Sequence, residues 1–438
     1  MRAFFGPNGW LARCHPRYEF RAGQVEMAEL VEAAFQGKRH LLVEAGTGTG
    51  KTLAYLVPAL LTERRVVVST GTKNLQEQLY LKDIPFLEQH FGRPLRVCYM
   101  KGRNNYLCRQ KLYDFTRQGA LEVVEEPEEL ALVRDWEPRT ETGDRAELAE
   151  LPETSTLWDR LDARRDHCTG QKCPQFDRCF LTEMHRRALQ SDLVIVNHHL
   201  FFADLALKAA RAVDVPGLGV IPDYSAVIFD EAHELEDIAA QYFGLSASNY
   251  RLEELARDCE ATLRQKQCGT AELFQAARAA RDRGEVLFGL LAGLLPEEGR
   301  VGFERRAQFL ERHAAAYAAA SNALAGLESS LAAIRDKPEE VHALARRAGE
   351  LRRDLGFLLE SDERSFVYWM ERRGRGLFLQ ATPIDVAPIL AQFLFEQLDT
   401  CVLTSATLAV AGSFEFIKRR LGIRQARQRA LDSHFDFA

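Results

Sequence analysis

Short apolar runs alternate with helical patterns over the first hundred residues. Leu41–Val43 precedes a glycine-rich loop, Thr52–Leu61 fits a helix, and Val66–Ser69 has the composition of a buried strand. A strand, a loop, a helix and a strand in this order predict a βαβ unit of a parallel sheet. Strand character returns further along the chain, at Leu193–Val196, Ala226–Phe229 and Cys401–Leu403.

A helical pattern dominates residues 240–362. Apolar residues recur every seven positions in one stretch, and a second such stretch follows the break at Lys337–Pro338; the first stripe is Leu310, Tyr317, Leu324 and Leu331, and the second begins at Leu344. Two amphipathic stripes on either side of a proline predict an antiparallel helical hairpin. Apolar extended segments resume at Phe366–Trp369 and Leu377–Leu379, so we expect the sheet domain to close around two insertions.

The first of these insertions covers residues 106–180. It contains four cysteines, an acidic stretch at Glu122–Glu129 and few strand signals. The expected division is therefore residues 1–105, 181–239 and 363–438 for the sheet domain, 106–180 for the cysteine module and 240–362 for an all-α domain.

Composition restricts the class of protein without specifying it. The 438 residues are 46% hydrophobic and 27% charged, which is ordinary for globular domains, and the net charge of −6 still permits a local basic groove. The N-terminus lacks the apolar region of a signal peptide, and the longest apolar run, Val286–Leu295, is too short to cross a bilayer. We expect a soluble cytoplasmic protein with no membrane partner.

The segment Glu44–Thr52, EAGTGTGKT, predicts a phosphate loop. Glycines let the backbone turn its N–H groups toward phosphate oxygens, Lys51 supplies a positive charge, and the Thr52 hydroxyl is a ligand for Mg²⁺. Position 45 is alanine where the strict pattern has glycine. The predicted ATP-contacting residues of the loop are Gly46, Thr47, Gly48, Thr49, Gly50, Lys51 and Thr52.

Two further polar motifs follow predicted strands. Asp230-Glu231-Ala232-His233 comes after Ala226–Phe229, where Asp230 suits Mg²⁺, Glu231 suits the attacking water, and His233 completes the predicted catalytic set with Lys51. Thr404, Ser405 and Thr407 come after the strand at Cys401–Leu403. We expect their hydroxyls to hydrogen-bond the acidic motif and couple it to the nucleotide state.

These motifs in this order resemble superfamily 2 helicases, and other segments narrow the resemblance. YEFRAGQVEM at Tyr18–Met27 is similar to that family's adenine-reading motif, which implies that Arg21 and Gln24 contact the base. KGRNNYLC at Lys101–Cys108 and DLVIVNHH at Asp192–His199 flank the cysteine module as in the XPD-like helicases, closest to the bacterial DinG/YoaA branch. The resemblance implies an α/β fold, namely a RecA-like P-loop parallel sheet with an iron–sulfur insertion and an all-α arch insertion.

The cysteine module has a spacing that bears on its chemistry. Cys108 stands alone, and Cys168, Cys173 and Cys179 follow as C-x4-C-x5-C. Four thiolates hold either zinc or an iron–sulfur cluster, and the absence of a C-x2-C pair disfavours zinc without removing it. Four unrelated buried cysteines are the remaining alternative. The resemblance implies a structural [4Fe–4S] cluster at these four positions.

Candidate DNA contacts lie in and near the module. The segment STGTKNLQEQ resembles a motif that contacts the DNA backbone, so we expect Thr72, Lys73, Asn74, Arg103 and Tyr106 to face DNA, with Tyr106 and Phe180 as stacking surfaces. About half of the basic residues that border the module are expected to contact DNA; these are Lys101, Arg103, Arg109, Lys111, Arg164, Arg165, Lys172, Arg178, Arg186 and Arg187.

The resemblance also shows what is not found in the sequence. In this family a second RecA-like lobe follows the TSAT motif and supplies an arginine to ATP, and none of the roughly thirty residues after Leu408 matches it. Arg373-Gly374-Arg375 superficially resembles part of that lobe's motif but is better interpreted as a basic hairpin turn. We therefore expect ATP binding with slow hydrolysis.

Two functions remain in competition. The first is the ATP-binding motor lobe of a 5′–3′ DNA helicase in DNA repair, acting on single-stranded or forked DNA with ATP, Mg²⁺ and the cluster. The second is an incomplete single-strand-binding or regulatory lobe that pairs with a second-lobe chain or with a repair or replication protein. A P-loop kinase accounts for neither the cysteines nor the order of motifs.

Overall fold

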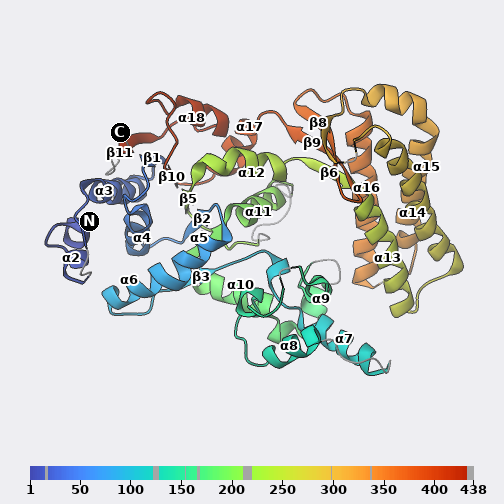
Figure 1. The fold of residues 1–438 in the computed structure, drawn as a ribbon, viewed down its shortest axis with the longest axis horizontal. Helices are drawn as coiled ribbons and strands as arrows, with labels where there is room; N and C mark the ends of the chain where they lie inside the picture. Colours follow the sequence, from blue (N-terminus) through green and yellow to red (C-terminus); the bar gives the residue numbers. More distant parts are fainter. Residues whose placement is uncertain are drawn as a thin grey trace. The chain divides into compact units, whose positions relative to one another are not determined.

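The computed structural model describes residues 1–14, 18–121, 128–152, 154–164, 168–210, 220–296, 298–335 and 338–431. Arg165, Lys337 and most of the acidic stretch Glu122–Glu129 lie outside these ranges. The chain forms two compact units (Figure 1). The lobe unit comprises residues 1–164, 172–239 and 386–438, and the arch unit comprises residues 165–171 and 240–385.

The lobe unit is built on a parallel sheet of seven strands. Their order across the sheet is β11-β1-β10-β5-β2-β4-β3. The strands are β1 Leu41–Ala45, β2 Val66–Thr70, β3 Val97–Tyr99, β4 Leu193–Asn197, β5 Ala226–Asp230, β10 Thr400–Ser405 and β11 Arg427–Leu431. Every residue of β2, β4, β5 and β10 is buried, which explains their unbroken apolar runs. The predicted α/β parallel sheet is confirmed.

Helices connect these strands and cover both faces of the sheet (Figure 1). They are α1 Arg2–Phe5, α2 Trp10–Cys14, α3 Ala22–Gly37, α4 Lys51–Leu61, α5 Lys73–Gln78, α6 Ile84–Phe91, α10 Phe180–Gln190, α11 His198–Ala210, α12 Leu235–Tyr242, α17 Ala387–Leu390 and α18 Glu415–Leu421, with single turns at Leu79–Asp83, Ala232–Glu234 and Ala391–Phe395. The helix predicted at 52–61 is α4, which begins one residue earlier.

The cysteine module contains short helices and a small core of its own. Its helices are α7 Arg109–Leu121, α8 Glu128–Trp136 and α9 Thr156–Leu161, with single turns at Arg103–Asn105, Arg145–Glu147, Gly170–Lys172 and Phe176–Arg178. Trp136 and Trp158 are buried in this core with Leu107, Leu112 and Val133. Isolated bridges join Tyr106 to Asp144 and Leu107 to Asp162, so the chain segments on either side of α7 and α8 are held together.

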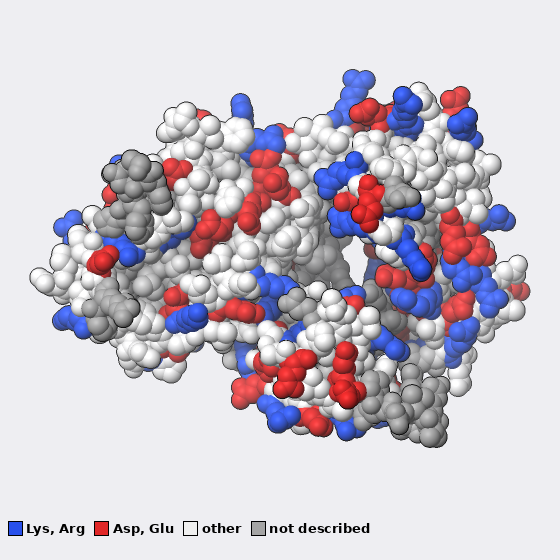
Figure 2. Space-filling view, in the orientation of Figure 1, with Lys and Arg blue, Asp and Glu red and all other residues white. Residues whose placement is uncertain are grey.

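The arch unit contains four long helices and a sheet. The helices are α13 Asn249–Gln265, α14 Ala271–Ala292, α15 Arg306–Ala332 and α16 Glu339–Glu360. The last two pack against each other, and Tyr317, Leu324 and Leu331 of the predicted stripe are buried between helices of this unit. The predicted helical hairpin is confirmed. Acidic and basic side chains are interspersed over the visible face of these helices (Figure 2).

The expectation that this domain is all-α is wrong. Strands β6 Leu245–Ser248, β7 Gly299–Gly302, β8 Phe366–Arg373 and β9 Gly376–Pro383 form an antiparallel sheet in the order β6-β9-β8-β7. We expected 363–385 in the sheet domain, whereas it lies in the arch unit. The reason is strand pairing: a tight link, in which Arg373 pairs with Gly376 and Gly374 has φ of 56°, joins β8 and β9 antiparallel, and their outer edges pair with β7 and β6 of the arch unit. The interpretation of this link as a hairpin turn is confirmed.

No helix in the described ranges is long and apolar enough to cross a membrane.

Candidate nucleotide-binding site and its surroundings

The predicted phosphate loop lies between β1 and α4. Gly48 and Gly50 have φ of 80° and 79°, a backbone conformation that side chains disfavour, so glycine is required at both positions. Ala45, which replaces the glycine of the strict pattern, is the fully buried last residue of β1. Because extended backbone does not need glycine, the alanine is compatible with the loop.

Two residues of α3 and its N-terminus contact the backbone of this loop. Gln24 is 4% exposed, and its Nε2 donates to the carbonyl of Gly50 at 3.0 Å. The Arg21 guanidinium donates to the carbonyl of Gly48. A side chain at position 50 would collide with the Gln24 amide, so Gly50 is also required by close packing. The structure thus brings both predicted adenine contacts against the phosphate loop.

The acidic motif begins at the end of β5, next to α4. Asp230 is 6% exposed and accepts a hydrogen bond from the Tyr55 hydroxyl at 2.9 Å. Glu231 has φ of 55°, which a non-glycine residue rarely adopts, and its Oε1 lies 3.3 Å from Lys51 Nζ. Strain of this kind concentrates at functional sites. The predicted residues Lys51, Asp230 and Glu231 therefore form one cluster.

The electrostatic state of Asp230 follows from its burial. Desolvation raises the pKa of this carboxyl above its usual range, and the nearby Lys51 and the Tyr55 hydroxyl lower it by less. A carboxylate held ionised against this penalty favours a cation beside it. Tyr55 also hydrogen-bonds Thr52, so the two predicted Mg²⁺ ligands share one hydroxyl neighbour.

We expect Asp230→Asn to raise Tm at pH 7. Because the folded pKa is raised, ionisation of Asp230 costs stability once the pH rises above the unfolded value of about 3.9, and the cost grows until the folded group has ionised. Asparagine keeps the acceptor for Tyr55 and removes the charge. Thermal unfolding at pH 7 and near pH 4 should show a gain that shrinks on acidification. The exposed Asp237→Asn is the control, and a lower Tm at pH 7 for Asp230→Asn would contradict the prediction.

Ser405 links the acidic motif to the end of β10. Its Oγ donates to Glu231 Oε2 at 3.2 Å and accepts from the Thr407 backbone N–H at 3.3 Å. His233 Nδ1 lies 2.8 Å from the same oxygen and donates to it, since the serine hydrogen is already used. Thr404 does not take part as predicted: its hydroxyl is fully buried, and no described residue hydrogen-bonds it.

Two contacts at this site were not predicted from the sequence. Glu44 Oε2 accepts from the backbone N–H groups of Leu408 and Ala409, both at 2.6 Å, and so joins the phosphate-loop strand to the segment after TSAT. A carboxylate one residue before the loop's alanine carries no distinctive signal. The contact becomes evident only from the pairing of β1 with β10, in which Glu44 lies opposite Ser405.

The other missed residue is His198, the first residue of α11. It is fully buried; its Nε2 lies 2.8 Å from the Asp230 carbonyl and its Nδ1 lies 2.7 Å from Ser69 Oγ. A carbonyl only accepts, so Nε2 carries the proton and Nδ1 accepts from Ser69. Burial lowers the pKa of His198 to about 4, so the ring is neutral at physiological pH. This neutral chain connects β2 to β5.

The predicted DNA contacts separate into two groups. Thr72, Lys73 and Asn74 are exposed at the start of α5, and Lys73 Nζ donates to Asn105 Oδ1 at 2.8 Å. Arg103 is half-buried and donates to the carbonyl of Ala163 at 2.9 Å. The stacking roles predicted for Tyr106 and Phe180 are wrong, because these rings are 3% and 4% exposed.

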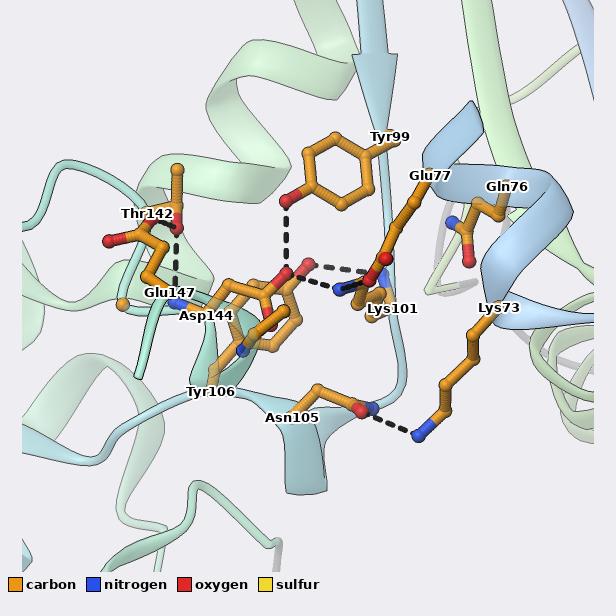
Figure 3. A network of polar contacts seen from close by, with 12 residues as sticks. Lys73, Gln76, Glu77, Tyr99, Lys101, Asn105, Tyr106, Thr142, Asp144 and Glu147 are labelled. Carbon is orange, nitrogen blue, oxygen red and sulfur yellow. Dashed lines mark hydrogen bonds and ion pairs between the residues drawn. The ribbon is translucent and has the colours of Figure 1, made fainter. Parts of the chain in front are cut away.

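Lys101 is also unavailable to DNA, because it lies at the centre of a buried polar network (Figure 3). Its Nζ lies 2.6 Å from Asp144 Oδ2 and 2.7 Å from Glu77 Oε1. The Tyr99 hydroxyl donates to Asp144 at 2.9 Å, and the Lys101 backbone N–H donates to the Tyr106 hydroxyl at 3.0 Å. The network therefore joins α5 to the cysteine module.

Other basic residues of the predicted DNA set are also held by carboxylates. Arg109 pairs with Glu137, Lys111 and Arg164 pair with Asp162, and Arg186 and Arg187 pair with Glu183. These pairs favour a structural use of the positive charge over a DNA-facing one. Arg165 lies outside the described residues.

The four cysteines of the module differ from the buried ones elsewhere. Cys108, Cys173 and Cys179 are half-buried and Cys168 is exposed, whereas Cys98, Cys259 and Cys401 are buried. Burial raises the pKa of Cys108, partly offset by the backbone N–H groups of Lys111 and Gln110, and Cys179 lies close enough to raise it further. Within the described ranges, no three His, Cys, Asp or Glu side chains gather as a metal-ligand set.

A parallel sheet with a phosphate loop after β1 and an acidic pair after β5 defines a P-loop nucleotide-binding lobe. Residues 24–140 match the family described as DEAD/DEAH box helicase. The chain is 35% identical to the ATP-dependent DNA helicase YoaA of Haemophilus influenzae over 99% of this chain and 66% of that protein. It is also 35% identical to YoaA of Escherichia coli, over 99% of this chain and 67% of that protein.

The chain belongs to the DEAD/DEAH box helicases, within the group that contains YoaA and DinG. It spans about two thirds of the length of the two YoaA relatives. A solved structure described as "XPD_Helicase" overlaps 95% of this chain and 62% of its own, with 15% identity and a TM-score of 0.48.

Proposed function

We infer that this chain is the ATP-binding first motor lobe of an ATP-dependent DNA helicase. One observation carries the inference: Lys51, Glu231 and Ser405 come from three separate motifs and form a continuous chain of polar contacts at the carboxyl ends of adjacent parallel strands. A phosphate-binding residue, a candidate base and a candidate sensor of the nucleotide state are then in direct contact.

The residues divide the work of hydrolysis among themselves. Lys51 leaves Glu231 for the β- and γ-phosphates, which frees the Glu231 carboxylate to orient a water molecule and accept its proton. Ser405 and His233 hold Glu231 in its strained conformation. Thr52 and Asp230 would hold Mg²⁺, which would supply positive charge against the phosphates; the buried Asp230 carboxylate and the Thr52 hydroxyl beside Tyr55 fit this ion.

Arg21 and Gln24 hold the adenine. Their contacts with the carbonyls of Gly48 and Gly50 support this role, because they hold both side chains against the predicted phosphate loop, within reach of a nucleotide bound there. A cavity of about 760 Å³ adjoins the same segment and is lined in part by Phe20, Ala22 and Val25.

The experiment that tests this function is single-turnover ATP hydrolysis by the chain, with and without single-stranded DNA. Hydrolysis should depend on Glu231 and increase when the strand is added. The proposal would be contradicted if single-stranded DNA did not accelerate hydrolysis and if hydrolysis persisted in Glu231→Gln. Nucleotide binding without any turnover would favour the alternative of a regulatory lobe that needs a partner chain.

An iron–sulfur cluster held by Cys108, Cys168, Cys173 and Cys179 belongs to the same proposal. The donor chemistry fits: none of these four cysteines is buried, in contrast to Cys98, Cys259 and Cys401, and no residue from Cys168 to Cys179 is buried. A segment without an apolar core needs another source of order, and a bound cluster supplies it by cross-linking the chain. Cys179 directly precedes α10, and Cys108 directly precedes α7, where the backbone N–H groups of Lys111 and Gln110 offset part of the effect of burial on the pKa of Cys108.

We expect Cys168→Ser to lose the cluster and to unfold the segment around Cys173 and Cys179, while ATP binding by the lobe persists. Iron analysis and the visible absorption spectrum of anaerobically purified protein measure the first effect. Hydrogen exchange of residues 168–179 measures the second. Cys268→Ser, which changes a half-buried cysteine of the arch unit, is the control; iron retained in full by Cys168→Ser would contradict the assignment.

A further inference from the structure

The antiparallel sheet of the arch unit has two chemically different faces. The inner face carries Tyr368, Met370, Leu379 and Ala381, which are buried in the core formed with the helices. Side chains alternate along a strand, so Val367, Trp369, Phe378, Gln380 and Thr382 share the outer face. Along β9 the burial alternates in the same rhythm, and Val367 on β8 is 51% exposed. The outer face therefore carries two half-buried aromatic rings, Trp369 and Phe378, of which Phe378 is flanked by Tyr250 of α13.

Trp369 is held rigidly on this outer face. Its Nε1 donates to Thr382 Oγ1 at 2.9 Å, and the Arg300 guanidinium lies 3.7 Å from its ring centre. The residue directly opposite on β7 is Gly302, which has no side chain to cover the indole. The ring is thus oriented by a hydrogen bond, the Arg300 guanidinium lies over its face, and the Glu304 carboxylate lies near Gly302.

Phe378 repeats this arrangement one diagonal step away. It pairs with Glu371, two residues from Trp369 along β8, so the two rings lie roughly 7 Å apart across the strands. The Arg373 guanidinium lies 5.6 Å from its ring centre, and the Tyr250 ring packs against it at 6.2 Å. Two aromatic rings, each with its own arginine, thus stand side by side.

Basic side chains outnumber acidic ones on this face and its hairpin turn. Glu371 pairs with Arg373 at 2.6 Å and Glu304 lies near Gly302, whereas no ion pair joins Arg300 of β7 or Arg375 of the turn to a described residue. Aromatic rings bind bases of any sequence by stacking, and neighbouring arginines contact the phosphates. One RNA-binding module uses a four-stranded sheet in this way, with aromatic residues of the sheet stacking two or three bases of single-stranded RNA.

We propose that the outer face formed by Arg300, Trp369, Arg373 and Phe378 is a stacking platform for two neighbouring bases of single-stranded DNA. The proposal rests on the function inferred above, since it specifies where the arch unit holds the strand. The pair of Arg300 and Trp369 could instead serve only to stabilise the sheet. In that case a change at Trp369 would leave the affinity for DNA unaltered, whereas the stacking role predicts a loss of affinity.

The test measures the affinity of the full chain for fluorescein-labelled oligothymidine by anisotropy at several salt concentrations. Trp369→Ala should weaken binding about tenfold, the worth of one stacked base, with little change in the salt dependence. Arg300→Gln should weaken binding and reduce the salt slope by about one. Arg346→Gln, at an exposed position on α16, is the matched control and should change neither.

Two further measurements separate loss of stacking from loss of folding. Trp369→Phe retains an aromatic face and should bind within about threefold of the parent chain. An oligonucleotide carrying 5-iododeoxyuridine should photo-crosslink to β8 or β9 of the unaltered chain. Parental affinity in Trp369→Ala, or crosslinks confined to other elements, would overturn the platform while leaving the proposed function intact. No binding of single strands by the parent chain would overturn both.

Discussion

Replacing Glu231 by glutamine is expected to slow ATP hydrolysis by the chain about 10²- to 10⁴-fold, the usual contribution of a positioned general base. Glutamine has nearly the same shape and keeps contacts with Lys51 and Ser405, but its amide does not accept a proton from water. ATP binding should persist, because Lys51 contacts the phosphates without first breaking an ion pair with the Glu231 carboxylate. The expected signature is therefore loss of hydrolysis with affinity retained or increased.

Single-turnover measurements make this effect visible even if hydrolysis by the chain is slow. Protein in excess over radiolabelled ATP and Mg²⁺ is quenched over hours, and affinity is measured separately with a fluorescent ATP analogue. Glu254→Gln, at an exposed position in the arch unit, controls for the loss of a negative charge. Hydrolysis by Glu231→Gln within fivefold of the parent would assign the proton transfer to another group.

The nucleotide site was accessible to sequence reasoning because local chemistry determines it. Gly48 and Gly50 need positive φ, and motifs that follow parallel strands emerge at the same edge of the sheet. Asp230 and Thr404 even occupy paired positions on β5 and β10. What the motifs did not reveal is the role of Glu44, whose two hydrogen bonds depend on a partner more than 350 residues away.

The errors have a shared physical cause. Lys101 and Tyr106 are residue types typical of an exposed nucleic-acid surface. Both are nevertheless buried in the network around Asp144, about forty residues further along the chain. The segments of β8 and β9 were recognised as extended, but a short apolar run does not say whether its neighbours are parallel or antiparallel. In both cases the outcome depends on tertiary partners, which periodicity and residue type do not encode.

Lys101→Met is expected to be the most destabilising of the substitutions considered. It would leave the Asp144 carboxylate, whose side chain is 2% exposed, without its cation, and breaking a buried pair in this way typically costs about 3–5 kcal/mol. Glu77, the second partner, is 32% exposed, so Glu77→Gln should cost about 1 kcal/mol or less. The strong pair is therefore the one that joins the lobe to the cysteine module.

Hydrogen exchange resolves this effect by segment, which matters because a chain with two units does not unfold in one step. Residues 99–106 and 143–146 should lose protection in Lys101→Met, while β1 and β5 keep theirs. Asp144→Asn retains the acceptor for Tyr99, so the double variant Lys101→Met/Asp144→Asn removes both charges and should recover part of the loss. The exposed Lys82→Met is the control.

If the double variant were as unstable as the sum of the single ones, the ion pair would not be what holds the module to the lobe. If the double variant regains stability, the ion pair couples the cysteine module to α5. The network in Figure 3 then transmits a displacement of the module to α5, and so to Thr72, Lys73 and Asn74 at the start of that helix.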